Sequence, residues 1–268
     1  MNKKILWTGF AVLALSIAAP CFADDDDDDD KGKGRGKGNK SEREIECGEL
    51  PSAAELREKL IASAPAPEGQ AATGPIGGLF NGRRMWAATV NRGGELCAIV
   101  ASTTDPTQVW PGSQAIAKSK AYTANAFSLD TLPLSTARLY TFTQPGHSLW
   151  SLGQSNLFET KFLNTPDEAR EGRGEIPGGL IFFGGGVALY RNGKIVGGLG
   201  ISGDTSCADH EIAKRTRNLL NLNPPGGQLA DDITYSNPDG ASVFTHPKCP
   251  NTWRNGISLV TENVAAGY

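Results

Sequence analysis

Residues 175–220 read EIPGGLIFFGGGVALYRNGKIVGGLGISGDTSCADHEIAKRTRNLL. Two apolar runs in this stretch, 187–190 and 194–201, are separated by Arg191-Asn192-Gly193. Asn-Gly accepts the positive φ angles of a tight two-residue turn, so the two runs are expected to pair as an antiparallel hairpin.

A helix is expected shortly after this hairpin. Ser206 fits the N-cap position, and Asp209 three residues later completes a capping box. The apolar spacing that follows is helical, which predicts that Lys214, Arg215 and Arg217 face outward.

The glycines of residues 198–203 match the pattern G-x-G-x-x-G. A dinucleotide site would also need a parallel βαβ unit and an acidic residue about 20 positions further on. Here the strand is the second arm of a hairpin, and Asn223-Pro224-Pro225 follows the helix. We therefore expect the small residues to let the hairpin pack tightly against a helix or a partner subunit.

The remaining elements fit the same architecture. A short amphipathic helix is predicted at 52–62, a second hairpin from strands 84–91 and 95–102, and a longer helix at 113–128 capped by Ser113. The longer helix carries a stripe of small residues, Ala117, Ala121 and Ala124. Hairpins interleaved with helices predict an α+β fold, in which a central antiparallel β-sheet is flanked by α-helices.

The ends of the chain differ from its centre in composition. Residues 1–23 resemble a secretory signal peptide, which predicts a periplasmic or secreted protein, and the apolar segment is too short for a membrane span. Residues 24–46, with seven consecutive aspartates and a Lys/Gly-rich run, are expected to form a disordered tether. Residues 47–221 would form the domain and 222–268 an irregular C-terminal extension.

Charge and cysteine content narrow the class of protein. The chain has 26 basic and 29 acidic residues, and this mild acidic balance gives no support for nucleic-acid binding. Four cysteines follow the signal segment, and an even number in an exported chain favours two disulfides. Of the three possible connectivities, Cys207–Cys249 with Cys47–Cys97 would tie both extensions to the domain. A four-cysteine zinc site is the alternative, although no C-x₂-C pair is present.

No hydrolase or metalloprotease motif is present, and attention falls on the histidines. His210 would lie in the first turn of a helix, where the dipole disfavours the imidazolium and keeps the neutral imidazole that haem iron requires. The same helix N-terminus could receive a carboxylate such as a propionate. Lys120 could pair with an anionic group, and the loop residues His147 and His246 could reach a cofactor.

Several segments together resemble a known family, the GlcG/HbpS-like haem-binding proteins, which are also similar to the C-terminal domain of PduO-type proteins. The matching segments span about Ser52 to Leu220 in the family's order. They are Val90–Leu96, Ala117–Phe127, Ile176–Leu180, and Asn192–Gly203 leading to Asp209–Ala213.

The resemblance implies an α+β fold, homo-oligomers and tetrapyrrole binding, with haem degradation proposed for some members. We expect an exported haem-binding protein, a carrier or sensor, with iron ligated by His210 or His147 and with no assigned catalytic residue. The alternative is a non-haem oligomeric interaction module or a small organic-acid-binding protein. The family's signature residues fall on Lys120, Gly178, Gly179, Gly203 and Asp209.

Overall fold

The fold is described from a computed structural model, which covers residues 47–65, 74–160 and 174–259. The expected signal peptide and aspartate-rich tether lie outside these residues. In the described part of the chain no helix has the length and apolar character needed to cross a bilayer.

The centre of the fold is a four-stranded antiparallel sheet in the order β2-β1-β4-β3. Its first hairpin joins β1 (Trp86–Asn91) to β2 (Leu96–Ala101), and its second joins β3 (Gly186–Arg191) to β4 (Lys194–Ser202). Asn192 and Gly193 have φ angles of 50° and 76°, so the predicted tight turn is confirmed. Both predicted hairpins are therefore present, joined through β1 and β4.

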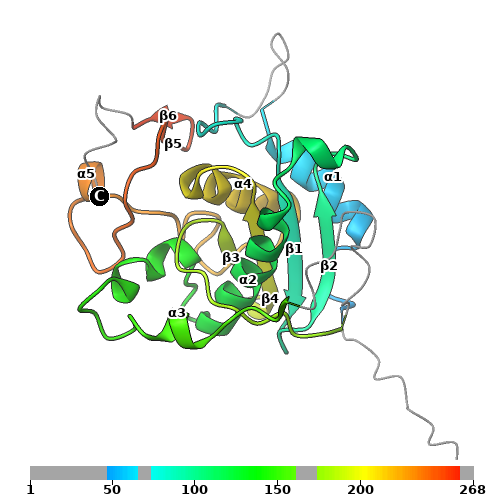
Figure 1. The fold of residues 1–268 in the computed structure, drawn as a ribbon, viewed down its shortest axis with the longest axis horizontal. Helices are drawn as coiled ribbons and strands as arrows, with labels where there is room; N and C mark the ends of the chain where they lie inside the picture. Colours follow the sequence, from blue (N-terminus) through cyan, green and yellow to red (C-terminus); the bar gives the residue numbers. More distant parts are fainter. Residues whose placement is uncertain (1–46, 66–73, 161–173, 260–268) are drawn as a thin grey trace, which may run out of the picture. The chain divides into compact units, whose positions relative to one another are not determined.

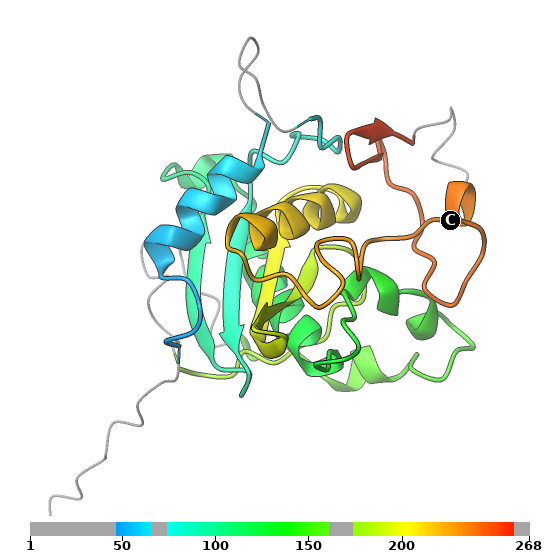
Figure 2. The same cartoon turned by 180° about the vertical axis from the view of Figure 1, so that it is seen from behind.

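Helices cover both faces of this sheet. Helix α2 (Gly112–Phe127) lies on one face, against β4, β1 and β3 (Figure 1). Helices α1 (Ala53–Ser63) and α4 (Ser206–Leu219) pack on the opposite face and against each other (Figure 2). This arrangement confirms the predicted α+β class.

The close approach of α2 to the sheet depends on the glycines of β4. A Cβ atom on Gly200 would lie 2.0 Å from the carbonyl oxygen of Ala117, and one on Gly198 would lie 2.1 Å from that of Ala121. Because no side chain fits at these positions, the glycine pattern serves helix–sheet packing, as predicted, and leaves no room for a nucleotide there.

Alternation along β1 divides the core between the two faces. Trp86, Ala88 and Val90 pack towards α2, whereas Ala87 belongs to the cluster beneath α1 and α4. Cys47–Cys97 and Cys207–Cys249 are both disulfides, so the favoured connectivity is confirmed and the four thiolates of a zinc site are not available.

Two predicted helix caps are wrong by one or two residues. Thr205, not Ser206, caps α4 by accepting a hydrogen bond from the Ala208 amide, since the helix begins one residue earlier than expected. Helix α2 begins at Gly112 after Pro111, with no side-chain cap, so Ser113 is already inside it.

Short elements complete the chain. Among the described residues between β2 and β3, α2 is accompanied by three 3₁₀ helices and one short helix: η1 (Pro106–Gln108), η2 (Thr136–Leu139), η3 (Thr141–Thr143) and α3 (Leu152–Ser155). The C-terminal extension, as far as residue 259, contains one short helix and one two-stranded ribbon: α5 (Ser236–Asp239), β5 (Trp253–Arg254) and β6 (Ile257–Ser258).

The described part of the extension, residues 222–259, packs against α4 and the edge strand β3. Arg217 is fully buried, binds Asp231 at 2.9 Å and donates to the Ala188 carbonyl at 3.1 Å. The Tyr190 amide donates to the Leu222 carbonyl at 3.0 Å. The prediction that Arg217 and Lys214 face solvent is therefore wrong, because the extension covers this side of the helix.

Candidate functional site

Lys120 and Asp209 come from different helices and meet in the interior. Lys120 Nζ lies 2.7 Å from Asp209 Oδ2, and the two side chains are 0% and 1% exposed. Lys120 Nζ also donates to the Ile201 carbonyl at 3.0 Å and lies 4.9 Å from the centroid of the Phe183 ring. The pair thus joins α2, the end of β4 and α4.

Burial dominates the electrostatics of this pair. Desolvation raises the pKa of Asp209 to about 6 and lowers the pKa of Lys120 from its usual value, while each partner counteracts the effect on the other. The carboxylate Oδ1 also accepts from the Asp204 amide at 2.9 Å. The pair therefore links α2 to α4 in the interior of the protein.

Of the three signature glycines, Gly179 is the one whose closest neighbours include a residue of α2. A Cβ on Gly179 would lie 2.6 Å from Ser119 Oγ, one residue before Lys120. Gly178 precedes it and forms an isolated bridge with Phe158, and Gly203 directly follows β4 and packs on the backbone of Arg84. The structure therefore brings Lys120 and Asp209 into contact and places Gly179 against the neighbouring Ser119, whereas Gly178 and Gly203 contact other segments.

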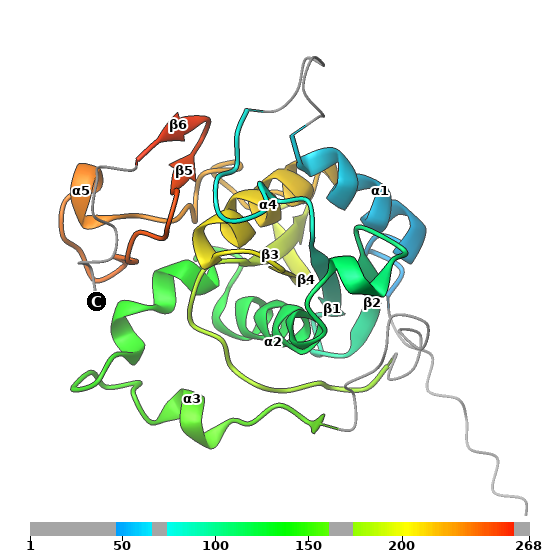
Figure 3. The same ribbon diagram turned by 45° about the horizontal axis from the view of Figure 1, so that its top comes forward.

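A groove lies beside this pair, on the outer side of α2. Residues 180–183 run between α2 and α3, because the Ile181 amide donates to Thr123 Oγ1 at 3.0 Å and Phe182 packs against Gly153 (Figure 3). The groove has a volume of about 260 Å³. Its lining is aromatic, aliphatic and uncharged polar: Tyr140, Thr143, Gln144, Trp150, Gly153, Gln154, Leu180, Ile181, Phe182 and Phe183.

The three histidines differ in accessibility. His210 is fully buried: its Nε2 accepts from the Ile233 amide at 3.1 Å, and its Nδ1 has no hydrogen-bond partner among the described residues. His246 is 1% exposed and accepts from the Gly184 amide. His147 is exposed, in the turn between the groove residues Gln144 and Trp150.

The expectation that the N-terminus of α4 receives a carboxylate is wrong. The Cys207 amide donates to Cys249 Sγ at 3.1 Å, and the Ala208 amide donates to Thr205 Oγ1 at 3.3 Å. The chain's own groups occupy the positions that an anion would take.

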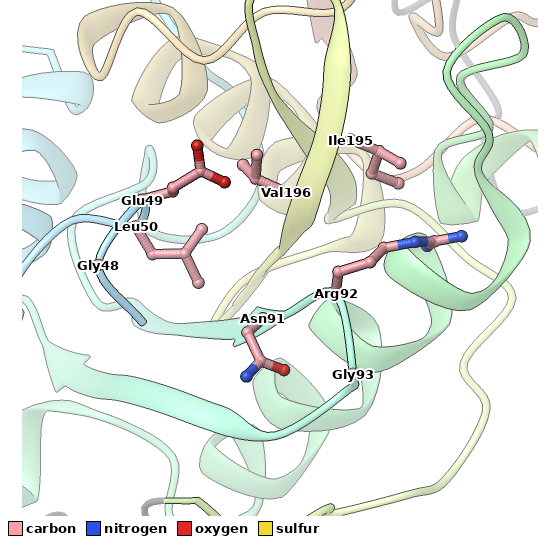
Figure 4. A pocket seen from close by; sticks show the side chains of 8 residues that line it. All are labelled: Gly48, Glu49, Leu50, Asn91, Arg92, Gly93, Ile195 and Val196. Atoms are coloured by element: carbon pink, nitrogen blue, oxygen red, sulfur yellow. The ribbon is translucent and has the colours of Figure 1, made fainter. Parts of the chain in front are cut away.

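A second hollow, of about 440 Å³, lies at the turn ends of the two hairpins (Figure 4). Its lining includes Glu49, Asn91 and Arg92, none of which belongs to the expected site. Arg92 is already bonded to the carbonyl and side-chain oxygens of Asn125. Elsewhere, the described residues contain no group of three or more His, Cys, Asp or Glu side chains able to hold a metal ion.

Sequence reasoning did not identify the groove. Its aromatic residues Tyr140 and Trp150 come from a segment without sustained periodicity, and Phe182 and Phe183 precede β3. The available signal was the apolar run Leu180-Ile181-Phe182-Phe183 directly after the paired glycines.

The fold and the site define a small α+β domain with a glycine-rich hairpin, an internal Lys–Asp pair and an aromatic groove. The sequence model of one family, described as "Haem degrading protein HbpS-like", matches residues 78–217. The chain therefore belongs to the HbpS-like family, as its motifs suggested.

Curated relatives match over a shorter stretch. The corrinoid adenosyltransferase PduO of Salmonella typhimurium is 34% identical over 110 residues, and that of Citrobacter freundii is 32% identical over 110 residues. Each alignment covers 41% of this chain and 25% of the relative. The chain thus matches about a quarter of the length of these enzymes.

Solved structures of related proteins were also found. A PduOC:haem complex is 27% identical, covering 52% of this chain and 80% of that chain with a TM-score of 0.37. HbpS is 18% identical, covering 63% and 89% with a TM-score of 0.39. Klebsiella pneumoniae ORFY is 23% identical, covering 52% and 75% with a TM-score of 0.37. Family membership accordingly rests on the sequence match over residues 78–217.

Proposed function

We propose that this protein is an exported haem-binding protein, a carrier or sensor, that holds the tetrapyrrole in the aromatic groove. The proposal is supported by the family, whose description refers to haem, and by a relative that was solved as a haem complex. The observation that carries it is the aromatic groove itself, two of whose lining residues, Gln144 and Trp150, are joined by backbone hydrogen bonds to the exposed His147.

The lining suits a flat, apolar ligand. Tyr140, Trp150, Phe182 and Phe183 provide aromatic surface from two chain segments. Pockets that enclose a drug-sized ligand measure roughly 300–1,000 Å³. A groove of about 260 Å³ therefore fits part of a macrocycle and leaves the remainder at the surface.

His147 is the histidine best placed to reach an iron at this groove. Haem, when bound, would supply an iron that an imidazole nitrogen could ligate. His210, the other expected ligand, would first have to lose its hydrogen bond from Ile233 and the extension that covers it. His246 is enclosed in the same way. We therefore assign the iron ligand to His147.

Export is supported by the two disulfides. Disulfides persist in oxidising compartments and are uncommon in the cytosol. Both pairs lie in the folded domain, where Cys97 and Cys207 are 7% and 2% exposed. A periplasmic or secreted location is therefore proposed. Assembly into homo-oligomers is proposed separately, because the family resemblance implies it.

Titration of haemin into purified protein lacking residues 1–23, followed at the Soret band, tests the proposal. We expect a saturable, shifted band for the unmodified protein and a different band position for His147→Ala. Gln154→Trp, which fills the groove from its rim, should weaken haemin binding at least tenfold. An exposed residue away from the groove provides the control, Lys194→Ala. Absence of a saturable shift would overturn the haem proposal and favour an interaction module or an organic-acid-binding protein.

A further inference from the structure

His246, a residue of the C-terminal extension, contacts two chain segments that contribute residues to the groove. The ring of His246 lies 5.0 Å from that of Tyr140, measured between centroids. Its Nε2 accepts a hydrogen bond of 3.2 Å from the amide of Gly184, the residue after Phe183. Tyr140 and Phe183 both line the groove and come from different segments of the chain, so His246 connects two parts of its lining.

The tautomer of His246 is fixed by its two partners. Nδ1 lies 2.7 Å from the Pro247 carbonyl, which can only accept, so Nδ1 carries the proton and Nε2 is free to accept from Gly184. Burial lowers the pKa of His246 to about 3, which keeps this neutral form at physiological pH. The neutral imidazole therefore donates one hydrogen bond through Nδ1 and accepts one through Nε2.

His246 is held in place three residues before a disulfide. Cys249 is bonded to Cys207 in the first turn of α4, and its amide donates to Thr252 Oγ1 at 2.8 Å. The His246 amide also donates to the Thr234 carbonyl at 2.8 Å. The disulfide thus fixes the extension at the point where it reaches the groove.

We propose that His246, anchored by the Cys207–Cys249 disulfide, is a positioning residue that sets the spacing of the two groove-lining segments without touching the ligand. This inference rests on the proposed function, since it concerns ligand binding in the same groove. It predicts that the disulfide between α4 and the extension controls haemin affinity, whereas the other disulfide does not.

The chain provides a matched control for this prediction. The two disulfides close segments of similar length, with sequence separations of 42 and 50. Removing either one should therefore lower the free energy of unfolding to a comparable extent. Only Cys207 and Cys249 are linked to the groove. Replacing both with Ala should weaken haemin binding at least tenfold, whereas replacing Cys47 and Cys97 should change it less than threefold. Equal losses would overturn the inference.

A second pair of variants tests the imidazole itself. His246→Gln keeps an amide oxygen that can accept from Gly184 and an NH₂ that can donate to Pro247, whereas His246→Leu keeps neither. We expect the Gln variant to bind haemin within threefold of the unmodified protein and the Leu variant to bind at least tenfold more weakly. Equal binding by both variants would contradict a bracing role.

Hydrogen exchange provides a readout that needs no ligand. The amides of residues 180–186 should exchange faster in His246→Leu and in the Cys207/Cys249 variant than in the unmodified protein or the Cys47/Cys97 variant. Unchanged exchange in this segment would overturn the inference. A missing Soret shift in the unmodified protein would instead count against the proposed function, so the two failures are distinguishable.

Discussion

Lys120 and Asp209 lie 89 positions apart in the chain, yet their side chains meet at 2.7 Å with almost no exposure to solvent. A buried ion pair loses the hydration of both charges, so removing one partner leaves the other without compensation. The two residues should therefore be tested together.

Lys120→Met should lower the free energy of unfolding by about 3–5 kcal/mol, because Asp209 would remain as an isolated buried carboxylate. Lys120→Met combined with Asp209→Leu should recover much of this loss. Urea unfolding followed by circular dichroism measures both effects. Lys194→Met, which breaks an exposed pair with Asp130, is the control and should leave the free energy of unfolding nearly unchanged, because solvent screens this pair.

If the double variant also binds haemin normally, the pair contributes to the fold and not to recognition. If it regains stability without regaining haemin binding, then Lys120 or Asp209 takes a direct part in holding the ligand.

Gly200→Ala should be strongly destabilising, by about 1–3 kcal/mol or more, because the new Cβ would lie 2.0 Å from the Ala117 carbonyl oxygen. Gly112→Ala is the matched control, since no atom lies within 4 Å of a Cβ built there and Ala favours the helix. Thermal melting of both variants measures the difference. A stable Gly200→Ala protein would mean that α2 does not pack closely on β4.

Acid should weaken the fold through His246. Its pKa of about 3 lies below the value of about 6.5 for free imidazole, so its stabilising contribution is complete above pH 6.5 and is lost as the pH falls towards 3. The nearby charges of Lys120 and His210 also lower the pKa of His246. The full effect is on the order of 4–5 kcal/mol, at 1.36 kcal/mol for each pKa unit.

The measurement is the free energy of unfolding between pH 7 and pH 4.5, for unmodified protein and His246→Gln. The unmodified protein should lose about 2–3 kcal/mol more than the variant over this range. The raised pKa of Asp209 acts in the opposite direction between about pH 3.8 and 6, but equally in both proteins. Parallel pH profiles would show that His246 is not buried in its neutral form.

The uncharged lining of the groove leads to a prediction about the ligand. If the apolar part of the macrocycle enters, the propionates stay in water, and esterifying them should not weaken binding. Haemin and its dimethyl ester should therefore quench tryptophan fluorescence, including that of Trp150, with affinities within threefold of each other. A tenfold weaker ester would show that a protein cation binds the carboxylates.

Local signals in the sequence were sufficient for most of the fold. Asn192-Gly193 needs only its neighbours to define a turn, and the alternation along residues 86–90 predicts a half-buried strand. The strand is present, but both of its faces are buried because helices cover both sides of the sheet. The cap of α4 was misplaced because Thr205 and Ser206 are adjacent and both are good N-caps.

Less of the site could be predicted from local sequence signals, because it depends on contacts between distant segments. Spacing alone could not pair Lys120 with Asp209, and only the family resemblance brought them together. Helical periodicity gave no warning that residues 222–259 would cover Arg217. Burial of His210 beneath the same extension was equally invisible from its place in a first turn.

The contact between the extension and β3 limits how copies of this chain can associate. An outer strand with free amide and carbonyl groups invites strand-to-strand polymerisation. On β3 the Tyr190 amide already pairs with Leu222, and the Ala188 carbonyl already accepts from Arg217. Removing the extension should free the Tyr190 amide and withdraw Asp231 from Arg217, and so expose this edge strand to pairing with another copy of the chain.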